Sequence, residues 1–387
     1  MPGGAFLLMW QTLQAGKPFC AYVDNLAADG SRYTVFATIT PLGDDYLSVR
    51  VRPQRTELLD AARGLYEAVR PQELAARDGG ASAHEAAQLG LGQLAELLVG
   101  AGIPSYDEFI WAALPAEVAG RSASTGGCPA RPDPTGPLAE LLASAGRLHQ
   151  GLATWVGELD ALAELADALV AGGTRLGESV AASEASASAF NDVVAAHDGF
   201  SPVLGSITLW AEMVAKVDTM LQGLAGRLAE LRTSVAQTRF GIALAALQSE
   251  TVGQFACELI DEVPGSDAAR PAIRELVRAL RAGVSDAAGA MDANAALATQ
   301  VADEVQALAE LMGIPTSLLG SFQGLAAGRS NPAVEELLPQ VADVVTRSQA
   351  DADALGALAE RCRGVRPLET APVLAELDAI DGLAASA

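Results

Sequence analysis

The sequence is poor in the residues that most often build catalytic and metal sites. It has three histidines, and 5% of its residues are aromatic. His84, His149 and His197 each stand without a partner at metal-ligand spacing. We therefore interpret all three as solvated or capping residues, and we predict neither a metal site nor a haem site.

Cysteine is also scarce, and its spacing is uninformative for metal binding. The four cysteines are Cys20, Cys128, Cys257 and Cys362, and no two of them form a CxxC pair. Scattered cysteines of this kind are typical of free thiols in a reducing compartment. This pattern of cysteines predicts a cytoplasmic protein.

Long apolar runs and basic clusters are missing as well. Glu, Asp, Gln or Gly interrupts each apolar stretch before it reaches the ~18–20 residues that a spanning helix needs. The first residues also lack the basic segment and apolar core of a signal peptide. The formal net charge is −23, with 48 Asp and Glu against 25 Lys and Arg. This acidity argues against nucleic acid and membrane insertion, because nucleic acids and anionic membranes are bound by basic surfaces.

No enzyme motif occurs in a fitting context. HExxH, GxSxG and GxGxxG are all absent from such a context. The stretch GGTRLGES, residues 172–179, is similar to a phosphate-binding loop, but Glu178 takes the place of the lysine and would repel phosphate. We interpret it as a loop between helices. Carboxylates that share a helix face, such as Asp60 and Glu67, have the spacing of an ordinary solvated face. We therefore predict a protein that is not an enzyme.

What is present begins with one helix and three strands. Apolar residues recur at helical spacing from Phe6 to Leu13, and Gly16 follows where a helix C-cap belongs. Asp29-Gly30 is a hairpin signal between two strand-like segments. The predicted strands, which we expect to form an antiparallel meander, cover residues 19–26, 32–42 and 46–52.

Helical patterns dominate after residue 55. Thr56 is placed to cap the first helix, and Ser82 with Glu85 and Ser105 with Glu108 have the spacing of capping boxes. Residues 121–137 are rich in Gly, Pro and Ser, which predicts a flexible linker. Leucines and alanines at three- and four-residue steps then indicate long antiparallel helices in a bundle or coiled coil. Predicted breaks fall at residues 171–177, 263–271, 313–315 and 328–332.

Residues 1–70 resemble a known family. The stretches MPGGAFLLMWQTLQAGKPF, YVDNLAADGSRYTVFATITPL, DYLSVRVRP and AARGLYEAVR are similar to the PAS domain of aerotaxis-receptor-like (methyl-accepting chemotaxis) sensory proteins. The matching positions are Met1, Pro2, Ala5, Phe6, Trp10, Asn25, Gly30, Tyr33, Pro41, Tyr46, Ser48, Arg50, Leu65 and Tyr66. The resemblance covers less than a fifth of the chain.

The resemblance implies a fold class and a set of boundaries. We expect a partial α+β PAS domain of antiparallel strands plus a helix, followed by a mainly α long-helix bundle or coiled coil. The expected parts are the C-terminal half of a PAS domain at 1–55, a connector helix at 56–78, a helix pair at 82–120, the linker at 121–137 and the bundle at 138–387. Either Met1 is an internal methionine of a longer chain, or the module is a true half-domain with open sheet edges.

The resemblance also implies a cavity between the sheet and the first helix. Its candidate lining residues are Trp10, Phe19, Tyr22, Asn25, Tyr33 and Phe36. Family members hold FAD in this cavity. Phe19 takes the place of a tryptophan that matters for the flavin, and the expected phosphate and ring contacts belong to the missing first half. FAD is therefore implied only for a chain in which that half is restored. The plainer interpretation of the six residues is ordinary core and turn positions.

Two functions remain open. In the first, a cytoplasmic sensory protein relays a small-molecule or redox signal from the PAS module to the helices and onward to a signalling partner. In the second, the chain is a helical interaction scaffold, and the PAS remnant serves dimerisation. We expect a homodimer through the helices, and the scaffold hypothesis in particular predicts tight self-association. No signalling tip of the chemoreceptor kind is present. Residues 237–250, QTRFGIALAALQSE, are the nearest stretch and represent either a degenerate tip or a core helix.

Overall fold

The computed structural model describes residues 1–131, 135–195, 201–326, 332–364 and 369–386. They form two compact units. Unit 1 comprises Met1–Gly157, Ala236–Gly289 and Glu369–Ala387, and unit 2 comprises Glu158–Val235 and Ala290–Leu368. Each unit is thus assembled from separate stretches of the chain. In the described residues, no helix combines the length and the apolar character needed to cross a membrane.

Unit 1 begins with the predicted helix and three-stranded sheet. These elements are α1 (Gly3–Gln14), β1 (Phe19–Leu26), β2 (Arg32–Leu42) and β3 (Asp45–Val51). The strands are antiparallel in the order β1-β2-β3, which confirms the expected meander. Gly16, Gly30 and Gly43 all have positive φ, so the chain reverses at residues that adopt this conformation without strain.

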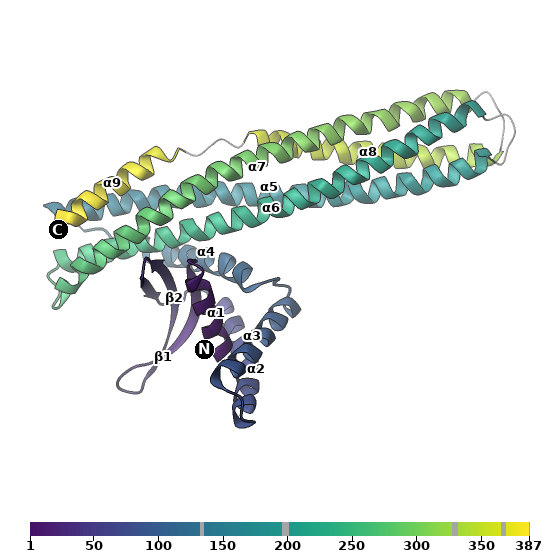
Figure 1. The fold of residues 1–387 in the computed structure, drawn as a ribbon. Helices are drawn as coiled ribbons and strands as arrows, with labels where there is room; N and C mark the ends of the chain where they lie inside the picture. The colour runs from purple at the N-terminus through teal and green to yellow at the C-terminus, as the bar shows by residue number, and fades with distance from the viewer. Residues whose placement is uncertain (132–134, 196–200, 327–331, 365–368, 387) are drawn as a thin grey trace. The chain divides into compact units, whose positions relative to one another are not determined.

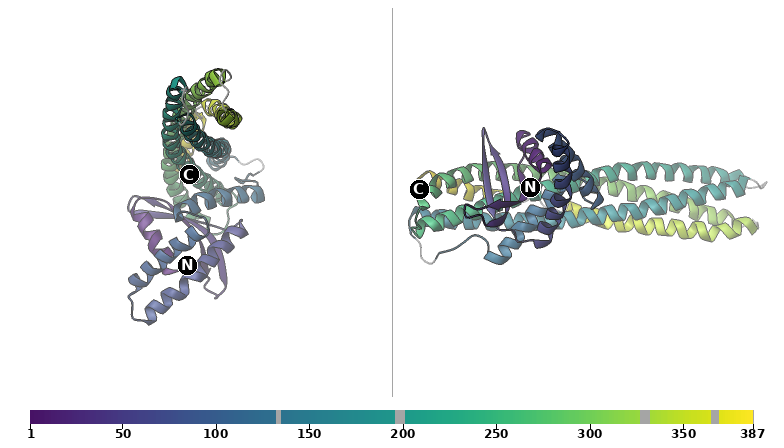
Figure 2. Two further views of the ribbon diagram at one scale, coloured as in Figure 1. Left: turned by 90° about the vertical axis from the view of Figure 1, so that its right-hand side faces the viewer. Right: turned by 90° about the horizontal axis from the view of Figure 1, so that it is seen from below.

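Three further helices complete this part of unit 1: α2 (Thr56–Asp78), α3 (Ala83–Gly100) and α4 (Tyr106–Thr125). The capping box of Ser82 and Glu85 is confirmed in both directions. Thr56, however, does not cap α2. The N-cap position is Arg55, which has no side-chain cap of its own. α1, α2 and α3 lie together on one side of the sheet (Figures 1 and 2).

Close contact between α1 and α3 depends on glycine. A Cβ atom added at Gly4 would lie 2.3 Å from the backbone nitrogen of Leu91, and one added at Gly90 would lie 2.1 Å from Oε1 of Glu73. Real atoms do not come this close, so a side chain at Gly4 would clash with the α3 backbone, and one at Gly90 would displace the Glu73 side chain. Two helices can approach this closely only where such small residues face each other.

The helical part of unit 1 is built from portions of three long helices and from α9 (Ala371–Ser386). The long helices are α5 (Pro137–Ala195), α6 (Ser201–Ile260) and α7 (Ala269–Ala326), and a short 3-10 turn, η1 (Ser266–Ala268), precedes α7. Arg147 of α5 bonds Glu376 of α9 at 2.6 Å. Arg281 of α7 bonds Asp378 of α9 at 2.8 Å. α9 therefore packs between α5 and α7.

Unit 2 is a four-helix bundle formed by the remaining parts of α5, α6 and α7 with α8 (Pro332–Arg363). Charged pairs link α6 to α5 through Arg232 and Asp167, and α6 to α7 through Arg227 and Glu304. Arg363 of α8 bonds Asp303 of α7. The hydroxyls of Ser183 and Ser348, 3.2 Å apart, join α5 to α8 inside the bundle. Each helix therefore contacts two of the other three, and the four segments run side by side (Figures 1 and 2).

Two of the predicted breaks are wrong. Residues 171–177 lie inside α5 and residues 313–315 lie inside α7, so GGTRLGES is helix and not a loop. The reason at the first position is packing: a Cβ at Gly172 would meet Leu355 Cδ1 at 2.8 Å, so glycine allows α8 to approach. The break at 263–271 is confirmed by η1. The fourth predicted break lies outside the described residues for all but Pro332, the first residue of α8.

α6 contains a stretch that is buried on every side. All residues from Ile242 to Glu250 are buried, although a helix at a protein surface normally buries one face. This confirms the core-helix interpretation of the QTRFGIALAALQSE segment. The range 121–137, interpreted above as a linker, begins within the last turn of α4. Its residue Arg121 forms an ion pair with Glu250 of α6, and Arg131 forms one with Asp261, the residue that follows α6.

Candidate functional site

The six candidate cavity residues are divided by the sheet register. Tyr22 pairs with Phe36 and Asn25 pairs with Tyr33, and residues three apart on one strand face opposite sides. Tyr22 and Phe36 are at most 2% exposed, and their rings lie 4.9 Å apart. The buried ring of Phe19 stacks on Tyr106 of α4 at 5.3 Å. These three aromatic residues thus form core contacts.

The other candidates lie elsewhere. Trp10 and Tyr33 are each 46% exposed. The ring of Trp10 meets Tyr46 of β3 edge-on, with centroids 5.6 Å apart. The side-chain nitrogen of half-buried Asn25 has no hydrogen-bond partner. The structure therefore brings Tyr22 and Phe36 together and separates them from Trp10, Asn25 and Tyr33.

A buried carboxylate on α4 connects the sheet to the start of α2. Glu117 is 2% exposed, and its Oε1 accepts a hydrogen bond from the Tyr22 hydroxyl at 2.7 Å. The backbone N–H of Gln54 donates to Oε2 at 2.6 Å, and that of Arg55 donates to Oε1 at 3.1 Å. Because the first N–H groups of a helix lack partners within the helix, Glu117 supplies the cap that Thr56 does not.

The same carboxylate affects the ionisation of its neighbours. Burial raises the pKa of the Tyr22 phenol, and the hydrogen bond to Glu117 raises it further. The Cys20 thiol is also buried, and desolvation followed by the Glu117 charge raises its pKa. Tyr22 therefore stays protonated, and it keeps its hydroxyl donor over the whole neutral range.

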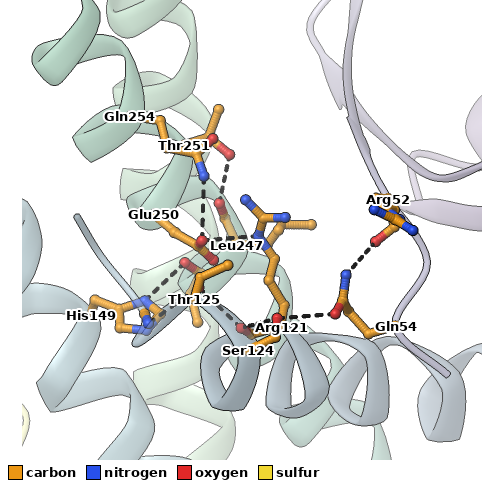
Figure 3. A network of polar contacts seen from close by, with 12 residues as sticks. Arg52, Gln54, Arg121, Ser124, Thr125, His149, Leu247, Glu250, Thr251 and Gln254 are labelled. Atoms are coloured by element: carbon orange, nitrogen blue, oxygen red, sulfur yellow. Dashed lines mark hydrogen bonds and ion pairs between the residues drawn. The ribbon is translucent and has the colours of Figure 1, made fainter.

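One turn further along α4, Arg121 reaches α6. Its Nε lies 2.9 Å from Oε1 of Glu250, and the two side chains are 14% and 1% exposed. Figure 3 shows this pair with Gln254, whose side-chain amide donates to the same oxygen at 3.4 Å. The second oxygen, Oε2, is buried without a hydrogen-bond partner. A charge buried this deeply depends on its arginine, because burial removes the carboxylate from bulk solvent.

His149 belongs to the same region, which corrects the expectation of a solvated or capping residue. It is 7% exposed, and its Nδ1 lies 3.2 Å from the carbonyl oxygen of Ala246 and 3.4 Å from the Ser249 hydroxyl (Figure 3). Ser249 is fully buried and donates to the same carbonyl at 3.2 Å. A serine held in this way has no access to a substrate, so the pair serves packing between α5 and α6. His84 is exposed and contacts Gln88 on its own helix, and His197 lies outside the described residues.

Cys128 closes the site on the side of the predicted linker. A Cβ at Gly253 would lie 2.4 Å from its Sγ, so the thiol sits directly on the α6 backbone. Burial raises the pKa of Cys128 to about 12, with a further contribution from the Glu250 charge. A thiol with such a pKa is almost entirely protonated at neutral pH and is a poor nucleophile. Among the described residues, no group of three or more His, Cys, Asp and Glu side chains is placed to hold a metal ion.

The residues of this network were missed at the sequence level. Glu117 and Arg121 stand four apart, which is the spacing of an exposed intrahelical ion pair, yet each bonds a different element. Glu250 did carry a signal, since it is the only charged residue between Arg239 and Glu258. A single charge in such a stretch indicates a buried and paired side chain.

No protein-family model matches the chain, and no solved structure matches it.

Proposed function

We propose that this chain is a non-catalytic relay protein of the sensory class, in which the state of the N-terminal α/β module is passed through α4 to α6. One observation carries the proposal. Two charged residues one turn apart on α4 bond two different elements. Glu117 accepts a hydrogen bond from Tyr22 of the sheet, and Arg121 forms an ion pair with Glu250 of α6. A shift of α4 therefore disturbs both contacts together.

The receiving element is suited to this role. Residues 242–250 of α6 are buried on all sides, and α6 is one continuous helix from Ser201 to Ile260. Packed interiors respond to displacement by repacking into discrete arrangements and not by gradual deformation. The resemblance of residues 1–70 to sensory PAS domains supports the same class of function.

Hydrogen–deuterium exchange provides the test. In Tyr22→Phe, Glu117 loses a donor, and we expect faster amide exchange in residues 240–254 of α6 as well as in β1. Tyr33→Phe is the matched control, because Tyr33 is 46% exposed and its ring lies away from Glu117; it should leave α6 unchanged. Coupling is reciprocal. Glu250→Gln should therefore speed exchange in β1. Changes confined to the module in the first variant, and to α6 in the second, would contradict a relay.

The second candidate is the interaction scaffold, and one observation favours it. A small-molecule sensor would have to bind its ligand near Phe19, Tyr22 and Phe36. These three side chains are buried and pack against one another or against α4. Thermal unfolding after equilibration with FAD distinguishes a small-molecule sensor from an interaction scaffold. A raised Tm together with a retained yellow chromophore supports a small-molecule sensor. An unchanged Tm supports a module whose input is another protein.

A further inference from the structure

β3 is the open edge of the sheet. In the order β1-β2-β3, the two outer strands differ in their surroundings. Among the described residues, α1, α2 and α4 contact β1, whereas the ladder partner of β3 is β2, and Tyr46, Ser48 and Arg50 of β3 are exposed. An uncovered edge strand offers a row of backbone donors and acceptors to another strand.

The register defines which backbone groups are on offer. Gly43 and Asp44 form a two-residue turn, which makes Leu42 and Asp45 a pair that exchanges both backbone hydrogen bonds. Such pairs alternate along the ladder, so odd-numbered residues of β3 bond β2. The residues whose N–H and C=O groups point outward are Tyr46, Ser48 and Arg50.

We propose that this edge binds the β3 strand of a second copy of the chain, antiparallel, about a two-fold axis at Ser48. In that register Tyr46 of each copy faces Arg50 of the other, and Asp44 faces Arg52. Each outward residue thus meets a backbone partner, and opposite charges meet at both ends. A parallel arrangement would instead place Arg50 beside Arg50, and like charges on neighbouring strands are destabilising. The strand is therefore complementary to itself in one direction.

The side chains beside this edge also favour binding of a second copy of the chain. Tyr46, Ser48 and Arg50 are exposed and share one face of the sheet. Trp10 already contacts Tyr46 edge-on, and both rings remain about half exposed, at 46% and 44%. An Arg50 guanidinium from the second copy would reach the free face of Tyr46, where a cation is attracted by the ring. Phe6, one turn before Trp10 and 45% exposed, extends the apolar surface.

This inference goes beyond the proposed relay, since none of its residues bonds Glu117 or Arg121. It also differs from a dimer through the helices. The first measurement is the mass of the full chain in solution by sedimentation equilibrium across a range of concentrations, where a monomer–dimer equilibrium is expected. A monomer at all concentrations would overturn the proposal.

The second measurement is a charge-reversal cycle. Asp44→Arg places two arginines opposite each other at both ends of the interface, and Arg52→Asp does the same with two aspartates. Each single variant should weaken the dimer about tenfold in Kd, because two like-charge contacts replace two favourable ones. The double variant restores opposite charges and should recover the Kd. A dimer that is indifferent to both single variants would overturn the β3 interface, and failure of the double variant to recover would do the same.

Ser48→Pro gives an independent check. The Ser48 N–H points away from β2, so proline should leave the sheet intact while removing the donor on the two-fold axis. We expect a folded monomer with an unchanged circular dichroism spectrum. A folded Ser48→Pro dimer of unchanged Kd would place the interface elsewhere.

Discussion

The carboxylate of Glu73, on α2, accepts a hydrogen bond from the backbone N–H of Gly4 at 2.7 Å. A second bond runs from the N–H of Gly3 at 2.8 Å, and Arg70 lies 3.0 Å from the same carboxylate oxygen. Pro2, the N-cap residue of α1, offers no side-chain cap. α1 is therefore capped by a residue far away in sequence, and the positive end of its dipole faces a buried negative charge.

This arrangement predicts a strong dependence on glycine at the α1–α3 contact. Gly90→Ala would place a Cβ atom 2.1 Å from Oε1 of Glu73, which must then move off the α1 N-terminus. We expect a loss of about 3 kcal/mol in the free energy of unfolding, at the upper end of overpacking effects. Gly92→Ala, on the same helix with open space around it, should gain about 0.5–1 kcal/mol from helix propensity. Urea denaturation of both variants provides the measurement, and similar values for the two would contradict the close approach.

A second prediction concerns the buried ion pair. Arg121→Met leaves Glu250 without its cation in a site where its carboxylate is 1% exposed. Removal of one partner from a buried pair costs about 3–5 kcal/mol. Arg131→Gln breaks a pair with Asp261 that is 35% and 40% exposed, so its cost should stay below about 1 kcal/mol. Chemical denaturation measures the free energy of unfolding of both variants. Equal losses of stability would mean that water reaches Glu250.

The buried phenol predicts a loss of stability at alkaline pH. The pKa of Tyr22 is raised in the folded protein above its ordinary value of 10.0. A raised pKa means that the folded state favours the protonated form, so the stabilisation is complete below pH ~10 and is lost as the pH rises further. Tyr22→Phe should therefore unfold less steeply with rising pH than the wild type. Parallel slopes, measured by denaturation at several alkaline pH values, would contradict the burial of this hydroxyl.

Neighbouring glycines in unit 2 provide a matched pair. A Cβ at Gly172 would lie 2.8 Å from the end of Leu355, whereas nothing lies within 4 Å of one at Gly173. Gly173→Ala should stabilise the bundle by about 0.5–1 kcal/mol. Gly172→Ala should be about 1–2 kcal/mol less stable than Gly173→Ala, because Leu355 must change its packing. Thermal unfolding of the two variants tests this order of stability.

Local signals in the sequence predicted the local structure well. The first two strands, the hairpin at Gly30 and the capping box at Ser82 depend on nearby residues, and each is confirmed, while the third strand lies one residue earlier than predicted. The glycines at 172–173 misled the interpretation because their role is to admit α8, which lies far away in sequence. A glycine that breaks a helix and a glycine that allows close packing look the same in a single sequence.

The candidate site was harder to predict for the same reason. Glu117 accepts a hydrogen bond from the backbone N–H of Arg55, the N-cap residue of α2, which lies 62 residues before it in the sequence. No local sequence pattern encodes such a contact. The positions three and four residues from His149 are Ala145, Gly146, Leu152 and Ala153, so His149 lies on an apolar helix face, and its ring contacts α6. Glu250 also carried a signal in its isolation among uncharged residues.

The interleaved order of the two units has a consequence for folding during synthesis. Unit 2 receives its last segment by residue 368, whereas unit 1 still awaits α9, the helix that bonds Arg147 and Arg281. Domains usually fold in the order in which they leave the ribosome. Here unit 1 contributes segments both before and after those of unit 2, so the α/β module lacks part of its helical support until α9 is made.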